Sequence, residues 1–284
     1  MTTGSFLDMQ AQVGITVHVG GLGERRTLLS ACHAENAREI LEVGCGIGVG
    51  PVHTARTYGC RVVAIDRSER MIEWSCERAR EERVADRIEL EIADVLALPF
   101  ESDRFDATIC ESVLAFVGDK QQAIREMVRV TKPGGYVGLN EMFLLTETPS
   151  SEVVALGRLQ ATEMVSLAAW NALWEASGLR ERVVRAYRID FAREVRNRLR
   201  WIGLRGLLGG LARIVRLYVT ERSLRPALRL MFGRLPKAPG AKPAAPSAWA
   251  SFGYGLFVGR RAFESTAAPP SVEAHHDQSL VGRR

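Results

Sequence analysis

The sequence predicts an α/β protein built on a doubly wound, seven-stranded and mostly parallel sheet. Three observations indicate it: short apolar runs alternate with helical stretches, several of these runs end on an acidic residue, and 46% of the 284 residues are hydrophobic. Alternation of strands and helices is typical of a parallel sheet with helices on both faces. A chain of this length can bury one large core, so we expect one main domain with additions.

The first expected strand runs into a loop with glycines at alternate positions. Residues 40–50 read Ile-Leu-Glu-Val-Gly-Cys-Gly-Ile-Gly-Val-Gly. Glycine allows a sharp turn close to a ligand, and the helix expected over 52–58 offers its N-terminal amides to that ligand. A dinucleotide fingerprint would have its third glycine at 49, but that residue is Val49 and the glycine is Gly48. The loop therefore favours a nucleotide site other than one for NAD, with a tight turn that binds nothing as the alternative.

A second buried strand is expected over 61–66, where the apolar residues are continuous and mostly β-branched. Asp66 ends this strand, and in a doubly wound sheet that position faces the crevice, where a carboxylate can accept hydrogen bonds from both ribose hydroxyls. The alternative role is a helix N-cap, for which Ser68 competes. Met71 or Ile72 could pack on an adenine ring or belong to the core.

The middle of the chain continues the alternation of strands and helices. The expected elements are a half-exposed strand over 88–93 that leads to Asp94, a strand over 105–110, a helix over 123–130, a break over 132–135, a strand over 136–141, a helix over 165–177 and a strand over 181–189. The partner of this sixth strand is expected much later, over 252–260, in an antiparallel pair. The residues between them would form a helical insertion between strands 6 and 7.

Four motifs in this order resemble the class I S-adenosylmethionine (SAM) dependent methyltransferases. They are the pattern acid-x-Gly-x-Gly-x-Gly of Glu42, Gly44, Gly46 and Gly48, the acidic Asp66, the pair Asp94-Val95, and the turn Arg129-Val130-Thr131-Lys132-Pro133-Gly134-Gly135. The resemblance covers well under half of the chain. It implies a Rossmann-like methyltransferase fold, SAM as the cofactor, and a carboxylate at position 94 that receives the adenine amino group.

The resemblance also implies a set of cofactor-binding residues and a cap. The expected cofactor contacts are Glu42, Gly44, Cys45, Gly46, Gly48, Asp66, Arg67, Met71, Asp94, Val95 and Glu111. No metal site is expected, because the five cysteines form no Cys-x-x-Cys pair and His275-His276 have no partners in sequence. Residues 1–37 would fold over the pocket and help to form the acceptor site.

Methyl transfer requires mainly that the acceptor be held in line with the methyl group and that water be excluded. A base is needed only where the acceptor must lose a proton. Glu111 and Glu141 follow the expected fourth and fifth strands and should face the cleft, so either could be this base, bind the sulfonium end, or cap a helix. His18 is the histidine considered for catalysis, against an ordinary loop role.

The chain lacks the Asn/Asp-Pro-Pro-aromatic motif of many amino-nitrogen methyltransferases. We therefore expect transfer to a small, lipophilic acceptor such as a quinone, isoprenoid or polyketide ring. The alternative is a non-catalytic SAM-binding module whose basic helices contact a membrane or nucleic acid.

The basic charge of the chain is concentrated in one segment. Residues 191–237 hold eleven arginines and one lysine against two glutamates, while the whole chain has a net charge of only +5. An apolar stripe at helical spacing runs through this segment: Leu207, Leu208, Leu211, Ile214, Val215 and Tyr218. Three roles are open for this segment: a lid that packs on the core, a helix that lies on anionic lipid, or a contact with nucleic acid. Nucleic acid is the least expected partner, because aromatic residues that could stack on bases are sparse.

The expected organisation follows from these features. Residues 1–37 form the cap, 38–190 the SAM-binding catalytic core, 191–248 the basic insertion and its linker, 249–263 the final core strand, and 264–284 a disordered tail. The sequence at Met1 has no secretory leader pattern and no run of 18 apolar residues follows, so we expect a cytoplasmic protein, with a peripheral position at the membrane as the alternative.

Overall fold

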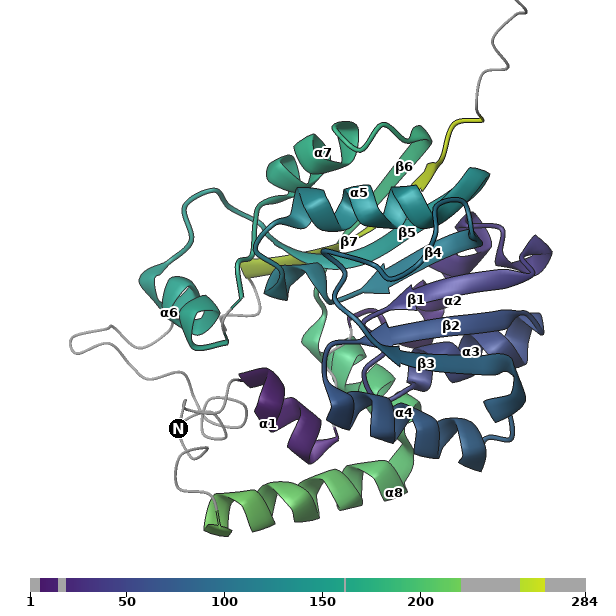
Figure 1. Cartoon of the computed structure of the whole chain (residues 1–284). Coiled ribbons are helices and arrows are strands. Elements are labelled where there is room, and N and C mark those ends of the chain that lie inside the picture. Colours follow the sequence, from purple (N-terminus) through teal and green to yellow (C-terminus); the bar gives the residue numbers. More distant parts are fainter. Residues whose placement is uncertain (1–5, 15–18, 161, 221–250, 264–284) are drawn as a thin grey trace, which may run out of the picture.

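The protein is built around one mixed β-sheet (Figure 1). The computed structural model describes residues 6–14, 19–160, 162–220 and 251–263. The strands of the sheet lie in the order β3-β2-β1-β4-β5-β7-β6. They are β1 Glu39–Val43, β2 Arg61–Asp66, β3 Ile88–Ile92, β4 Phe105–Glu111, β5 Thr131–Leu144, β6 Arg180–Arg188 and β7 Phe252–Arg260. Strands β1 to β5 pair in parallel, whereas β7 is antiparallel to both β5 and β6. The predicted seven-stranded, mostly parallel sheet with its terminal antiparallel pair is confirmed.

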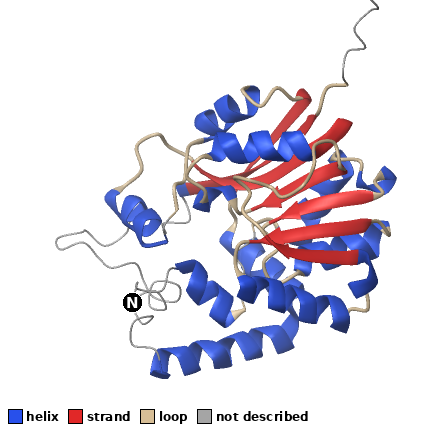
Figure 2. Cartoon of the chain, in the orientation of Figure 1, coloured by secondary structure: helices blue, strands red, loops and turns tan. Residues whose placement is uncertain are grey.

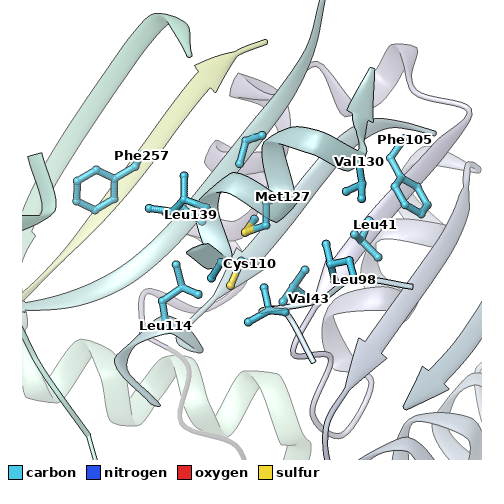
Figure 3. Packing of buried hydrophobic residues seen from close by; sticks show 14 of the residues in the cluster. Leu41, Val43, Leu98, Phe105, Cys110, Leu114, Met127, Val130, Leu139 and Phe257 are labelled. Carbon is cyan, nitrogen blue, oxygen red and sulfur yellow. The ribbon is translucent and has the colours of Figure 1, made fainter. Parts of the chain in front are cut away.

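Helices cover both faces of this sheet (Figure 2). They are α1 Phe6–Val13, α2 Gly21–Ala31, α3 Val49–Tyr58, α4 Glu69–Glu81, α5 Lys120–Val130, α6 Ser151–Gln160, α7 Leu167–Glu175 and α8 Phe191–Thr220, with short 3₁₀ turns η1 Ala34–Asn36, η2 Ala85–Arg87 and η3 Leu114–Phe116. Successive strand residues point to opposite faces, so the sheet divides the core in two. Leu41 belongs to a cluster that includes Met127 and Val130 of α5 (Figure 3) and two tryptophans of α7, whereas Ile40 packs with residues of α2 and α3.

Strand β5 is longer than the sequence predicts. The break expected over 132–135 lies inside the strand, where the register against β4 shifts between Phe105 and Ala107. The extra residues are taken up as a bulge, and Gly134 has a left-handed φ of 80° there. The strand then continues through Glu141 to Leu144, because β7 pairs with it as far as Leu144.

Helix α8 lies along the N-terminal helices (Figure 1). Near its start, the Glu194 carboxylate accepts a hydrogen bond from the Gly20 amide at 3.2 Å. Towards its end, Arg213 donates to the Val13 carbonyl at 2.6 Å and lies over the Trp74 ring. The part of the basic insertion beyond residue 220, its linker and the tail lie outside the described residues. No helix in the described ranges is both long and apolar enough to cross a bilayer.

A matched pair of substitutions tests the position of the core. Leu139 in β5 is fully buried, whereas Leu208 in α8 is 58% exposed. Leu139→Ala should lower the free energy of unfolding by about 2–5 kcal/mol through lost burial and a residual cavity. Leu208→Ala makes the same chemical change and should alter it by at most about 0.5 kcal/mol. Equal losses in urea denaturation would contradict this packing.

Candidate functional site

A cavity of about 600 Å³ lies where β1, β2 and β4 end and their loops begin. The carboxyl ends of parallel strands are where doubly wound sheets bind their ligands. Helices α1 and α2 close one side of the cavity through Gln10 and Arg25. The expected site residues that line it are Glu42, Gly44, Cys45, Gly46, Asp66, Arg67, Met71, Asp94, Val95 and Glu111.

The loop after β1 turns sharply at its alternate glycines. Gly44, Gly46 and Gly48 have φ values of 72°, 52° and 79°, in the left-handed region that other residues rarely adopt. Gly48 does not line the cavity, in contrast to the sequence expectation. It is the N-cap of α3, and a Cβ there would lie 2.7 Å from the Ser75 Cα. Its role is to let the loop pass close to α4.

Asp66 ends β2 with its carboxylate at the cavity. One oxygen accepts a hydrogen bond from the Gly46 amide at 3.0 Å, and the other accepts from the Ser68 amide at 2.9 Å. Burial raises the pKa of Asp66, while these backbone hydrogen bonds act in the opposite direction. Ser68, and not Asp66, is the N-cap of α4, so the alternative role considered for Asp66 is not observed.

Two further expected contacts lie on the same side. The Asp94 carboxylate accepts from the Leu96 amide at 2.9 Å and remains exposed, whereas the adjacent Val95 is buried against the cavity. Met71 of α4 lines the cavity, while Ile72 packs with the core cluster beside α3. The structure therefore separates these two neighbours into a site residue and a core residue.

Arg25 is a buried site residue that the sequence analysis missed. This α2 side chain is 1% exposed and donates hydrogen bonds to Glu111, to Glu42 at 2.5 Å, and to the Thr54 hydroxyl at 2.7 Å. Burial opposes the charge of Arg25, but Glu42 and Glu111 raise its pKa above the ordinary value. The sequence does contain an indication that Arg25 is buried, because Arg25 lies on the same helix face as the apolar residues Leu28 and Leu29, three and four positions further on.

The pKa of Glu42, which contacts Arg25, is also shifted. Burial raises its pKa to about 7, although the Arg25 guanidinium acts in the opposite direction and Glu111 adds to the rise. The Glu111 carboxylate also accepts a hydrogen bond from the side-chain amide nitrogen of Asn140 at 3.4 Å. Two carboxylates and one guanidinium therefore meet at one end of the cavity.

Glu141 does not face the cavity, so this part of the expectation was wrong. It lies within β5, is fully buried, and accepts hydrogen bonds from the Val113 and Leu114 amides, both at 2.9 Å. Burial raises its pKa to about 7. Glu141 thus caps the turn η3, whose Val113 lines the cavity. The third candidate, His18, lies outside the described residues.

The described residues contain no group of histidine, cysteine and carboxylate side chains that could hold a metal ion. Cys45 lies in the glycine loop as a buried thiol, and its pKa is raised mainly by burial and then by Asp66 and Glu42. A raised pKa disfavours the thiolate, so this residue is poorly suited to act as a nucleophile.

Comparison with known proteins shows that the chain is similar to methyltransferases. Residues 41–139 match a family model described as "Methyltransferase domain". The chain is similar to phosphoethanolamine N-methyltransferase 1 of Triticum aestivum, with 26% identity over 64% of this chain and 36% of that protein. It is also similar to methyltransferase GfsG of Streptomyces halstedii, with 32% identity over 42% of this chain and 44% of that protein. The match thus spans less than half the length of these relatives.

Solved structures share the fold at low identity. The [4+2]-cyclase SpnF superposes with a TM-score of 0.67 and 16% identity, covering 90% of this chain and 94% of that one. A Haemonchus contortus phosphoethanolamine N-methyltransferase 2, in complex with phosphomonomethylethanolamine and S-adenosylhomocysteine, gives a TM-score of 0.63 and 17% identity over 92% and 58% of the two chains.

The domain match, the strand order and the glycine loop lead to the same conclusion. Over residues 41–139 the chain matches a methyltransferase domain, and its sequence and fold are similar to those of class I SAM-dependent methyltransferases.

Proposed function

We propose that the protein transfers the methyl group of SAM to a small, lipophilic acceptor. The observation that carries the proposal is the gathering of ten expected cofactor contacts around one cavity of about 600 Å³. This volume is in the range of small-molecule sites. The experiment that tests it is methyl transfer from labelled SAM.

The cavity's residues fit the two ends of SAM. Asp66 would accept hydrogen bonds from the ribose hydroxyls, while Met71 and Val95 offer apolar contact to the adenine. At the other end, Glu42 and Arg25 provide opposite charges for a methionyl ammonium and carboxylate. The left-handed glycines keep side chains away from the space between these ends.

Bound SAM would supply an electrophilic methyl group on its sulfonium. The chain's own part is then to orient the acceptor and to exclude water, both of which lower the barrier to transfer. Glu111 lines the cavity and remains the candidate contact for the acceptor or for the sulfonium end. Since Arg25 already engages the Glu111 carboxylate, we favour a positioning role for this residue.

Apolar side chains beside the cavity support a lipophilic acceptor. Val113, Phe116 and Val117 line its wall after β4. Related proteins are named for varied acceptors: 27-O-demethylrifamycin SV in Amycolatopsis mediterranei and geranyl diphosphate in Streptomyces coelicolor, but also phosphoethanolamine in plants. A non-catalytic SAM-binding module is the alternative, and the cyclase SpnF illustrates that one fold hosts several activities.

A peripheral membrane contact through α8 is the second candidate function. Leu208, Leu211, Val215 and Val219 recur at helical spacing, and each is more than half exposed. This exposure argues against a stripe that packs on the core as a lid. The sequence of α8 holds seven arginines against one glutamate, which suits an anionic lipid surface.

Incubation with methyl-labelled SAM tests the activity directly. We expect label to enter an organic-soluble product when the protein is supplied with quinones, isoprenoids or polyketides. Gly46→Val should abolish this incorporation, because valine cannot adopt the φ of 52° without strain. Tight SAM binding without transfer to any extract component would favour the non-catalytic module.

The ribose contact is tested by Asp66→Asn. Loss of the charged acceptor should weaken SAM binding by about 1–3 kcal/mol, measured by calorimetry. Asp86→Asn, an exposed position outside the cavity, is the matched control and should leave the affinity unchanged. Tight binding of NAD with no response to SAM would contradict the cofactor assignment.

The membrane contact is tested with vesicles. Vesicles containing anionic lipid should bind the protein at low salt, and added salt should weaken the binding by screening the arginines. The double change Leu211→Ser and Val215→Ser should release the protein. As a control, Val183→Ser and Val184→Ser alter exposed valines of β6 and should leave vesicle binding intact. Binding that the α8 changes do not reduce would refute the contact.

A further inference from the structure

Helix α1 lies at the cavity and also contacts α4 and α8 (Figure 1). Its Gln10 lines the cavity and is only 4% exposed. The next residue, Ala11, packs in a buried cluster with Ile47 of the glycine loop and Met71 of α4. Because Met71 also lines the cavity, one turn of α1 forms part of the cavity wall and supports the wall beside it.

Trp74 of α4 holds the end of α1 from one side. Its indole Nε1 donates a hydrogen bond to the Ala11 carbonyl at 2.9 Å. The chain then runs close to the ring, since a Cβ on Gly14 would lie 3.1 Å from the Trp74 Cε2 atom. The last carbonyls of a helix have no partner within the helix, so a donor from another element stabilises this end.

Arg213 of α8 holds the same end of α1 from the other side. Its Nε donates a hydrogen bond to the Val13 carbonyl at 2.6 Å. Its guanidinium also lies 4.9 Å from the centre of the Trp74 ring, and the guanidinium of Arg70 lies 4.5 Å from that ring. A cation is favourable both at a helix C-terminus and over an indole face. Arg213 therefore connects α1, α4 and α8 at one point.

The contact with α1 uses the face of α8 that lies away from its apolar stripe. Leu211 and Val215 are each two positions from Arg213, which corresponds to about 200° of rotation around a helix. They are 52% and 57% exposed, whereas Arg213 is half-buried. Helix α8 is thus held to α1 by an arginine, and its apolar stripe is not needed for this contact.

The first half of α8 is tied to α2 in the same way. Arg193 forms an ion pair with Glu24 of α2 at 2.8 Å, and the Asn197 side chain donates to the Gly20 carbonyl at 3.2 Å. Gly20 is the N-cap of α2. Polar contacts therefore run along α8 from α2 to α1, the two helices that close one side of the cavity.

We infer that α8 is a strap that holds α1 over the cavity, and that Arg213 and Trp74 are positioning residues for the ligand bound there. Neither residue lines the cavity, so both act on the ligand through α1. The inference rests on the proposed function, because it takes SAM as this ligand. Movement of α1 away from the cavity opens a path for SAM to leave, and the contacts of Arg213 and Trp74 oppose that movement.

The dissociation rate of labelled SAM from the full-length protein, chased with excess unlabelled S-adenosylhomocysteine, tests the inference. Arg213→Ala removes the hydrogen bond to Val13 and the cation over Trp74, so the rate constant should rise about threefold to tenfold. Trp74→Phe removes the donor to Ala11 and should also speed dissociation. Arg213→Lys keeps a cationic donor and should remain within about twofold of the wild type.

Two controls separate positioning from a general effect. Arg216→Ala removes the same charge at an exposed position of α8, and it should leave the dissociation rate within about twofold of the wild type. Leu139→Ala weakens a core cluster that does not include α1, and it should lower stability without faster dissociation.

A dissociation rate of Arg213→Ala within twofold of the wild type would overturn the inference. Equally fast dissociation from Arg213→Ala and Leu139→Ala would overturn it as well, because loss of stability alone would then explain the effect. Absence of SAM binding by the wild type would instead refute the proposed function.

Discussion

The contact of Arg25 with Glu42 and Glu111 is the constraint on which the site depends. A guanidinium removed from water is costly unless it is paired and hydrogen-bonded. Arg25 is 1% exposed, so α2 can pack against the sheet only where the carboxylates that end β1 and β4 receive it. The same contact positions α2 and closes one side of the cavity.

The other elements of the site meet at the same edge of the sheet. The left-handed glycines turn the chain after β1, and the Gly46 amide binds Asp66 at the end of β2. Glu141, buried within β5, fixes the turn after β4 that forms another wall. Helix α8 then lies over α1 and α2 and supports the cap from outside. The cavity and the outer helix α8 are therefore connected through the two N-terminal helices.

Local sequence patterns were sufficient for the sheet and for most of the residues that line the cavity. Strand ends and glycines determine where Asp66 and the loop lie, and both can be read from neighbouring residues. Glu141 was misplaced because the length of β5 depends on pairing with β7, more than a hundred residues later. Arg25 was missed because an arginine on an apolar helix face usually extends to solvent, and its two acidic partners lie on distant strands. The exposure of the α8 stripe likewise depends on packing and not on periodicity.

A crystal structure with S-adenosylhomocysteine bound would show whether this cavity holds the cofactor. We expect density for the nucleoside between Asp66 and Val95, and density for the amino-acid end beside Glu42 and Arg25. Ligand density elsewhere on the protein, with this cavity filled only by solvent, would contradict it.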